Sequence, residues 1–233
     1  GAFRRHIAGR AGDRRGTLGI RRHAHVRSRR QRRTALVIGA VAMLAVAPQA
    51  FGYRVLYAEQ LYELYHLHLH QYPDYTMENI VWLQQALKAD FANPLNALAV
   101  VETQEEWSYY RSLFRMHVNV LLAQLHMTLG SKFDKRRAYF FNASWAWANL
   151  ESLEHAADAY ETARAYWVEA LHWSDEAWQL RRPGLDLPRI QNWADQNYLI
   201  ETGEFDYDEI IDENLERLRE VRQAFLEMDE TTY

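Results

Sequence analysis

Cysteine is absent from the 233-residue sequence. This absence excludes disulfide bonds, thiolate metal sites, thiol nucleophiles and a lipid-modified cysteine behind an export signal, so the folded domain must be stabilised by packing alone. The sequence also lacks the nucleophile elbow, the P-loop, the dinucleotide fingerprint and the HExxH pattern. Nothing in it therefore requires an enzyme, and we expect no cofactor.

Positive charge is scarce beyond the amino-terminal region. Residues 1–33 hold twelve of the 27 basic residues and one acidic residue, Asp13, whereas the rest of the chain carries 15 basic and 30 acidic residues. Recognition of nucleic-acid phosphates requires clustered Lys and Arg on the folded domain. The charge distribution therefore predicts an acidic domain that has no nucleic-acid partner.

An uncharged apolar run, TALVIGAVAMLAVA, occupies residues 34–47 directly behind a group of arginines. It is shorter than the roughly 20 apolar residues that span a bilayer, but it suits a secretory signal, and the small residues Ala50 and Gly52 favour cleavage after Gly52. The alternative is an uncleaved signal that anchors the protein in the membrane. We therefore expect three segments: a basic, disordered or untranslated region at 1–33, a signal at 34–52, and an exported, periplasmic domain at 53–233.

The exported domain is predicted to be all-α, because its apolar residues recur at intervals of three and four rather than two. Thr103 and Glu106 form a capping box for a long helix, which we expect to end with Gly130 in the left-handed conformation. Asp134 is expected to cap the next helix. The predicted helices are 53–72, 77–91, 94–101, 104–130, one after Asp134 that carries Phe140, Phe141, Trp145 and Trp147, 152–182, one from Pro188 that breaks near Gly203, and 207–227.

Large and small apolar residues alternate along one face of the predicted helix 152–182. Leu153, Tyr160 and Trp167 recur every seven residues, with alanines at 156, 163 and 170 between them. Alanine permits close approach of a partner helix, so we expect this face, including Trp167, to lie in the core. A second apolar line at 166, 173 and 180 indicates that the helix is covered on two faces and is an interior element.

Several fragments resemble tetratricopeptide repeats. Ala156, Tyr160 and Ala163 match the spacing in the second helix of that repeat, and Leu129, Gly130 and Phe133 match its LGxxY fragment. The segment Ala86, Leu87, Asp90, Asn93 and Pro94 is similar to the boundary between two repeats, although no 34-residue period recurs. The resemblance implies antiparallel helical hairpins stacked into a short solenoid that binds a peptide, a protein or a small ligand. An irregular helical bundle is the alternative.

Candidate metal ligands lie on the first predicted helix, where Glu59, Glu63, His66 and His70 fall on one face. His66 and His70 are one turn apart and, with Glu63, form a possible divalent metal site. The ExxH pairs Glu63–His66 and Glu169–His172 have the spacing of di-iron carboxylate bundles. The alternative for these residues is a solvent-facing helix surface, and His68 is expected in the core.

Tryptophan is the remaining compositional signal, with eight in the chain and five between positions 145 and 178. We expect most of them in the core and some on a recognition surface, since Trp is favoured at the centres of protein interfaces. The candidate partner-binding residues are Trp145, Trp147, Tyr166, Trp173 and Trp178.

These observations together predict a non-catalytic periplasmic scaffold or adaptor that binds another envelope protein. The chain also resembles helical periplasmic proteins of spirochaetes, including those associated with periplasmic flagella. Two alternatives stay open: a helical solute- or metal-binding protein that works with a transporter, and a metalloenzyme. The carboxy-terminal helix 207–227, with one apolar stripe and a charged reverse, is predicted to cap the helical stack.

Overall fold

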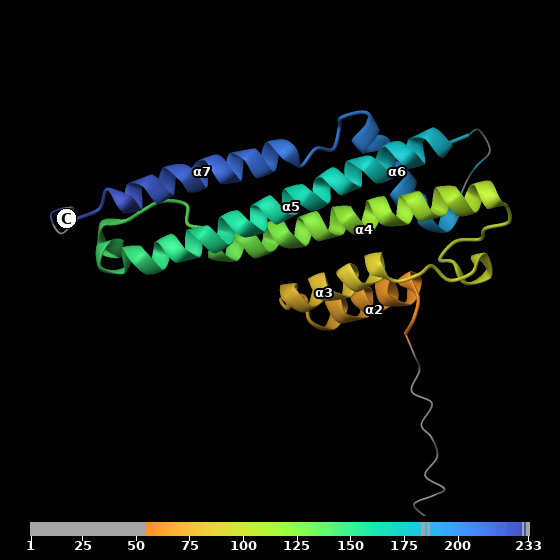
Figure 1. The fold of residues 1–233 in the computed structure, drawn as a ribbon, viewed down its shortest axis with the longest axis horizontal. Helices are drawn as coiled ribbons and strands as arrows, with labels where there is room; N and C mark the ends of the chain where they lie inside the picture. The colour runs from red at the N-terminus through yellow and green to blue at the C-terminus, as the bar shows by residue number, and fades with distance from the viewer. Residues whose placement is uncertain (1–54, 183–184, 186, 230, 232–233) are drawn as a thin grey trace, which may run out of the picture. The chain divides into compact units, whose positions relative to one another are not determined.

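The computed structural model describes residues 55–182, 185, 187–229 and 231, without the side chains of 140–142. The predicted all-α fold is confirmed, because these residues form helices and no strand (Figure 1). The predictions for 1–33 and 34–52 lie outside the described residues. Within the described part, no helix is both long and apolar enough to cross a membrane.

The helices are α2 (Ala58–Gln71), α3 (Thr76–Lys88), α4 (Gln104–Phe133), α5 (Ala146–Leu180), α6 (Gln191–Glu201) and α7 (Asp208–Leu226), with short 3-10 helices η1 (Pro94–Asn96), η2 (Phe140–Trp145) and η3 (Pro188–Ile190).

The two longest helices, α4 and α5, form an antiparallel hairpin (Figure 1). Its register is fixed at both ends. Near the connection, the hydroxyl of Ser152 donates to the carbonyl of Phe133 at 2.6 Å. At the far end, Arg182 pairs with Glu105 at 3.1 Å. With a rise of about 1.5 Å per residue, the hairpin extends for roughly 45–50 Å.

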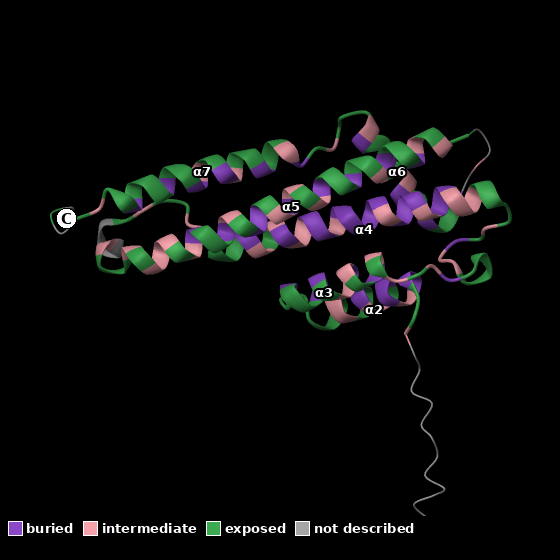
Figure 2. Cartoon of the chain, in the orientation of Figure 1, coloured by how far each residue is buried: buried purple, intermediate pink, exposed green. Residues whose placement is uncertain are grey.

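The shorter helices pack on this hairpin. Helices α2 and α3 form a second hairpin, which the backbone bond from Ala58 N to the carbonyl of Asp90 closes at 2.9 Å. Helix α3 packs against α4, α6 contacts both α4 and α5, and α7 lies along α5. Buried residues follow the sides of the helices that face one another (Figure 2).

The predicted alternation of large and small residues on α5 is confirmed. Leu153, Tyr160 and Trp167 are all buried, as are the alanines at 156, 163 and 170. The indole of Trp167 packs against the rings of Phe205 and Tyr207, with centroids 5.7 and 5.2 Å away. The second line of residues, at 166, 173 and 180, is half-buried, so α5 is covered on more than one face.

The cap at Thr103 is confirmed. Its hydroxyl accepts from Glu106 N at 3.1 Å, and the Glu106 carboxylate accepts from Thr103 N at 3.1 Å. The prediction for Gly130 is wrong: α4 continues through it to Phe133, and Gly203, with φ 74°, is the one described glycine with positive φ. Gly203 interrupts the chain between α6 and α7, as predicted.

The prediction that Asp134 caps the next helix is also wrong. Asp134 follows the last residue of α4, and the chain continues in irregular conformation to η2 before α5 begins at Ala146, earlier than expected. The Asp134 carboxylate accepts instead from the hydroxyl of Tyr160 and from Arg217 of α7. Asp134, at the end of α4, thus links this helix to both α5 and α7.

The apolar stripe of α7 is buried as expected at five positions. Ile210 and Leu226 are exceptions, being 44% and 51% exposed. Helix α7 lies lengthwise on α5, and Asp212 forms an ion pair with Arg164 there. The buried residues are Ile211, Leu215, Leu218, Val221 and Phe225.

Candidate functional site

The candidate metal ligands Glu63, His66 and His70 lie on α2 and are exposed. In the described part of the chain, no three His, Asp or Glu side chains are grouped so as to hold a metal ion. The ring of His66 packs edge-on against Tyr62, with centroids 4.5 Å apart, and this partial burial lowers its pKa. His68 is half-buried, and its Nδ1 lies 2.8 Å from Oδ1 of Asn79.

Glu59 departs from the predicted solvent-facing surface of α2, because it is only 2% exposed. Its Oε2 accepts from Ala92 N at 2.9 Å, and its Oε1 accepts from the hydroxyl of Tyr110 at 3.3 Å. Burial and then the charge of Glu59 raise the pKa of Tyr110. Glu59 therefore fastens the start of α2 to α4 and to the segment that follows α3.

A second buried polar group centres on His117 of α4. Its Nδ1 lies 2.8 Å from Oε1 of Gln196, and its Nε2 lies 3.0 Å from the hydroxyl of Tyr62. The amide oxygen of Gln196 only accepts, so Nδ1 carries the proton and Nε2 accepts from Tyr62. Burial lowers the pKa of His117 to about 4, which keeps the ring neutral at pH 7. Both ring nitrogens of His117 have a protein partner, as is usual for a buried histidine with a structural role.

The five candidate partner-binding residues do not form one surface. Trp145 and Trp147 are 64% and 67% exposed at the connection between α4 and α5. Trp173 and Trp178 are half-buried at the other end of α5, under the guanidinium groups of Arg115 and Arg181 respectively. At about 1.5 Å per residue, Trp147 and Trp178 are separated by roughly 46 Å along the helix.

Tyr166 lies between these two ends and borders a groove between α4 and α5. Its hydroxyl accepts from Nε2 of Gln84 on α3 at 2.9 Å, and its ring stacks on His126. The groove has a volume of about 350 Å³. We call it the distal groove, and its lining residues are His126, Leu129, Phe133, His155, Asp158, Ala159 and Thr162.

His126 distinguishes the distal groove from an ordinary gap between helices. The residue is 9% exposed, its ring lies 5.3 Å from that of Tyr166, and neither ring nitrogen has a hydrogen-bond partner among the described residues. Burial lowers its pKa and favours the neutral ring. A neutral imidazole can donate one hydrogen bond and accept another. The groove thus combines an apolar lining with an unused buried donor and acceptor.

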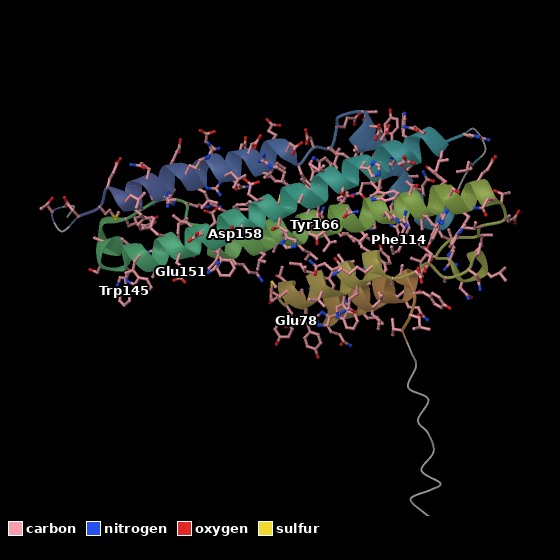
Figure 3. The ribbon with its side chains drawn as sticks, viewed as in Figure 1. Glu78, Phe114, Trp145, Glu151, Asp158 and Tyr166 are labelled. Atoms are coloured by element: carbon pink, nitrogen blue, oxygen red, sulfur yellow. The ribbon has the colours of Figure 1, made fainter. Side chains whose placement is uncertain are left out.

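Acidic and aromatic side chains lie along α5 beside this groove (Figure 3). Asp158 is exposed and lines the groove, and Glu151 is exposed nearer the connection to α4. Trp145 projects away from the helices beyond Glu151. The groove therefore has an apolar floor and an acidic margin.

A second groove, of about 350 Å³, separates α5 from α7. Apolar residues from both helices form part of its lining, and both signs of charge are present. The charged residues are Glu154, Glu161, Arg164, Asp212, Arg219 and Arg222. Arg164 and Asp212 already pair across it, so its charges are partly satisfied within the protein.

Residues 105–228 match the family model described as a domain of unknown function, DUF8513, which covers more than half of the chain. The chain belongs to the DUF8513 family. The matched residues run from the first turn of α4 to just beyond α7 and contain the distal groove, whereas the α2–α3 hairpin precedes them. No curated protein and no solved structure matches the chain.

Sequence reasoning identified the aromatic residues of α5 but missed the distal groove. The lining residues of α4 follow helical spacing at 126, 129 and 133, and those of α5 at 155, 158, 159 and 162. That spacing was available from the sequence. The antiparallel register that brings the two sets together was not, because it depends on contacts between residues far apart in the chain.

Proposed function

We propose that this DUF8513 protein is a non-catalytic adaptor of the bacterial envelope that binds a segment of another exported protein in the distal groove. The observation that carries the proposal is His126, a buried ring with two unpartnered nitrogens at an apolar surface. Leaving a buried polar group unpaired costs about 1–3 kcal/mol. A bound partner offsets this cost when the His126 ring, whose nitrogens are buried in the structure, turns toward the groove and receives a hydrogen bond from it.

The chemistry of the groove defines the partner. Leu129, Phe133 and Ala159 offer apolar contact, so the bound segment carries an apolar side chain. Asp158 and Glu151 give the margin a negative charge, so a basic residue flanks that side chain. An amphipathic helix or a short extended peptide with these features fits a groove between two helices. The resemblance to tetratricopeptide repeats also supports a peptide-binding role.

The expected export signal at 34–52 supports an envelope location, and the acidity of the rest of the chain supports a protein rather than a nucleic-acid partner. A component associated with periplasmic flagella is one such partner. In this proposal the protein has no reaction of its own. It holds a partner segment against the rigid α4–α5 hairpin.

Site-specific photocrosslinking in the native envelope tests the proposal. A photoreactive benzoylphenylalanine is placed at His155, an exposed residue of the groove, and in a control at Glu216, an exposed residue of α7. We expect one discrete adduct with a second protein from position 155 and none from position 216. The absence of a discrete adduct, or equal adducts from both positions, would contradict the proposal.

Matched substitutions on α5 make the test specific. Thr162→Arg places a long cation inside the groove, whereas Val168→Arg places the same side chain on an exposed part of the same helix, where the valine is 55% exposed. We expect Thr162→Arg to abolish the adduct and Val168→Arg to retain it. If a small solute of the envelope blocks the adduct when added in excess, the protein is a solute-binding component instead.

A further inference from the structure

The connection between α4 and α5 differs in charge from the rest of the domain. Four basic residues lie at 132–137, and Asp134 is the one acidic residue between positions 131 and 150. From residue 34 onward the chain carries 15 basic and 30 acidic residues. More than a quarter of this positive charge is therefore concentrated at one end of the hairpin (Figure 1).

These cations are not neutralised by neighbouring carboxylates. The side chain of Asp134 is 7% exposed and is already paired with Arg217 of α7. Lys132 donates to the carbonyl of Asp74 and to the hydroxyl of Thr76, which are uncharged acceptors. In the described part of the chain, no ion pair involves any of the basic residues 135–137. The connection therefore carries three basic side chains, at 135–137, that form no ion pair in the described part of an otherwise acidic chain.

Exposed aromatic rings accompany the cations. Trp145 and Trp147 are 64% and 67% exposed, and Tyr139 is 38% exposed. The guanidinium of Arg137 lies 4.6 Å from the centre of the Tyr139 ring. Two strongly exposed tryptophans within three residues are unusual for a surface that contacts only water. Tryptophan, tyrosine and basic residues are instead the side chains that concentrate at membrane–water interfaces.

We propose that this end of the hairpin docks on a bilayer surface rich in anionic phospholipids. We call it the basic aromatic tip, and its residues are Lys132, Lys135, Arg136, Arg137, Tyr139, Trp145 and Trp147. The cations are attracted to the negative potential of the headgroups, and the indole rings lie at the headgroup level. The acidic remainder of the domain is repelled by the same potential. The α4–α5 hairpin consequently meets the membrane with its tip.

This inference is separate from the proposed function and from any membrane attachment through residues 34–47. The distal groove lies along the side of the hairpin, and its lining includes none of the basic or tryptophan residues of the tip. A hairpin held by its tip leaves the groove accessible to a partner. Tip docking therefore places the partner segment at a fixed distance from the bilayer.

A fluorescent label at a single introduced cysteine provides a local readout, because the full chain has no cysteine of its own. The full-length protein is labelled with an environment-sensitive nitrobenzoxadiazole group at Ser144→Cys, in the tip, or at Glu220→Cys, on the exposed side of α7. Vesicles contain phosphatidylcholine either alone or mixed with phosphatidylglycerol. We expect a blue-shifted, brighter emission only from the label at 144 and only with phosphatidylglycerol. An unchanged emission at 144 would overturn the inference, even if residues 34–47 bind the vesicles.

Charge reversal then tests whether the basic residues of the tip attract it to the anionic lipid. The variant Lys135→Glu, Arg136→Glu, Arg137→Glu is compared with Arg189→Glu, Arg219→Glu, Arg222→Glu, which makes the same charge change at three exposed arginines outside the tip. We expect the tip variant to weaken the response at 144 by roughly tenfold or more, and added salt to weaken it in the unmodified protein. Equal loss in both variants would show that net charge alone governs binding and would overturn the tip assignment.

Removal of the two indole side chains tests whether the tryptophans contribute to membrane docking. Trp145→Ala with Trp147→Ala leaves the buried core intact, because both side chains are exposed. We expect the double variant to keep its circular dichroism and to lose most of the response at 144. If instead it retains the response but loses the photocrosslink at 155, the tip serves the protein partner, and the membrane inference is wrong.

Discussion

Gly130 of α4 lies directly against the ring of Tyr160 of α5. A Cβ atom at position 130 would lie 2.7 Å from Cε1 and 2.9 Å from Cδ1 of that ring. The ring cannot easily move aside, since it is 2% exposed and its hydroxyl donates to Asp134 at 3.1 Å. Glycine at 130 thus permits the close approach of the two long helices, rather than ending the first of them.

Gly130→Ala is expected to destabilise the protein by about 1–2 kcal/mol, because overpacking against Tyr160 outweighs the roughly 1 kcal/mol that alanine gains over glycine in a helix. Urea denaturation measures the change. In a Tyr160→Ala background the same substitution should be neutral or stabilising, because the obstructing ring is gone. Equal effects in both backgrounds would show that the close approach is unimportant.

Trp167 and Trp147 should respond in opposite ways to truncation, although both lie on α5. Trp167 is 1% exposed and Trp147 is 67% exposed. We expect Trp167→Ala to lower the free energy of unfolding by about 3–5 kcal/mol, the usual cost of removing a large buried aromatic side chain. Trp147→Ala should change it by no more than about 0.5 kcal/mol. A loss below about 1 kcal/mol for Trp167→Ala would contradict its burial in the core.

Arg217 is expected to contribute more to the stability of the fold than Arg219, which lies two residues further along α7. Arg217 pairs with Asp134, whose side chain is 7% exposed, whereas Arg219 pairs with Glu216 at 4.0 Å and both of those side chains are more than 70% exposed. Arg217→Ala removes the one cation that pairs with this buried carboxylate, leaving it only the hydrogen bond from Tyr160, and should cost about 1–3 kcal/mol. Arg219→Ala should cost less than about 0.5 kcal/mol. Chemical denaturation of the two variants side by side distinguishes these cases.

His117 should make the stability depend on pH. Burial lowers its pKa to about 4 in the folded protein, against about 6.5 in the unfolded chain. As the pH falls below about 6.5, the unfolded chain therefore takes up a proton that the folded protein does not, and stability falls until about pH 4. The slope from this group is at most about 1.4 kcal/mol per pH unit.

The variant His117→Gln removes this titration and keeps a polar side chain beside Tyr62 and Gln196. Its stability between pH 7 and pH 4 should decline less steeply than that of the unmodified protein, when both are measured by urea denaturation. His126 acts in the same direction, because burial also lowers its pKa, so part of the dependence remains. Parallel curves for the two proteins would contradict the assignment to His117.

Removal of residues 206–233 should expose the side of α5 that α7 covers. The deletion removes the buried residues of α7 between Ile211 and Phe225 from the core, and it removes Tyr207, which packs against Trp167. We expect aggregation or loss of cooperative thermal unfolding, as seen by light scattering and circular dichroism. A monomeric truncated protein of unchanged stability would show that α7 is an interaction arm rather than a structural element.

Local sequence patterns determined much of the fold. The three-and-four spacing identified the helices, the capping box placed the start of α4 at Thr103, and the seven-residue recurrence identified Trp167 as a core residue. Each of these properties depends on residues within a turn or two of one helix, so the sequence contains the information directly. The stacking of hairpins as a tetratricopeptide-like solenoid stays a prediction.

The tertiary structure alone decided how those helices meet. Glu59 and Glu63 share one face by helical spacing, yet Glu59 is buried against Tyr110 and Ala92 while Glu63 is exposed, because the segment after α3 covers only one of them. The sequence alone predicts a helix end at Gly130, whereas in the structure the helix continues and the ring of Tyr160 packs against this glycine. The distal groove likewise exists only in the antiparallel register of α4 and α5. Register results from packing between residues tens of positions apart, and no local pattern encodes it.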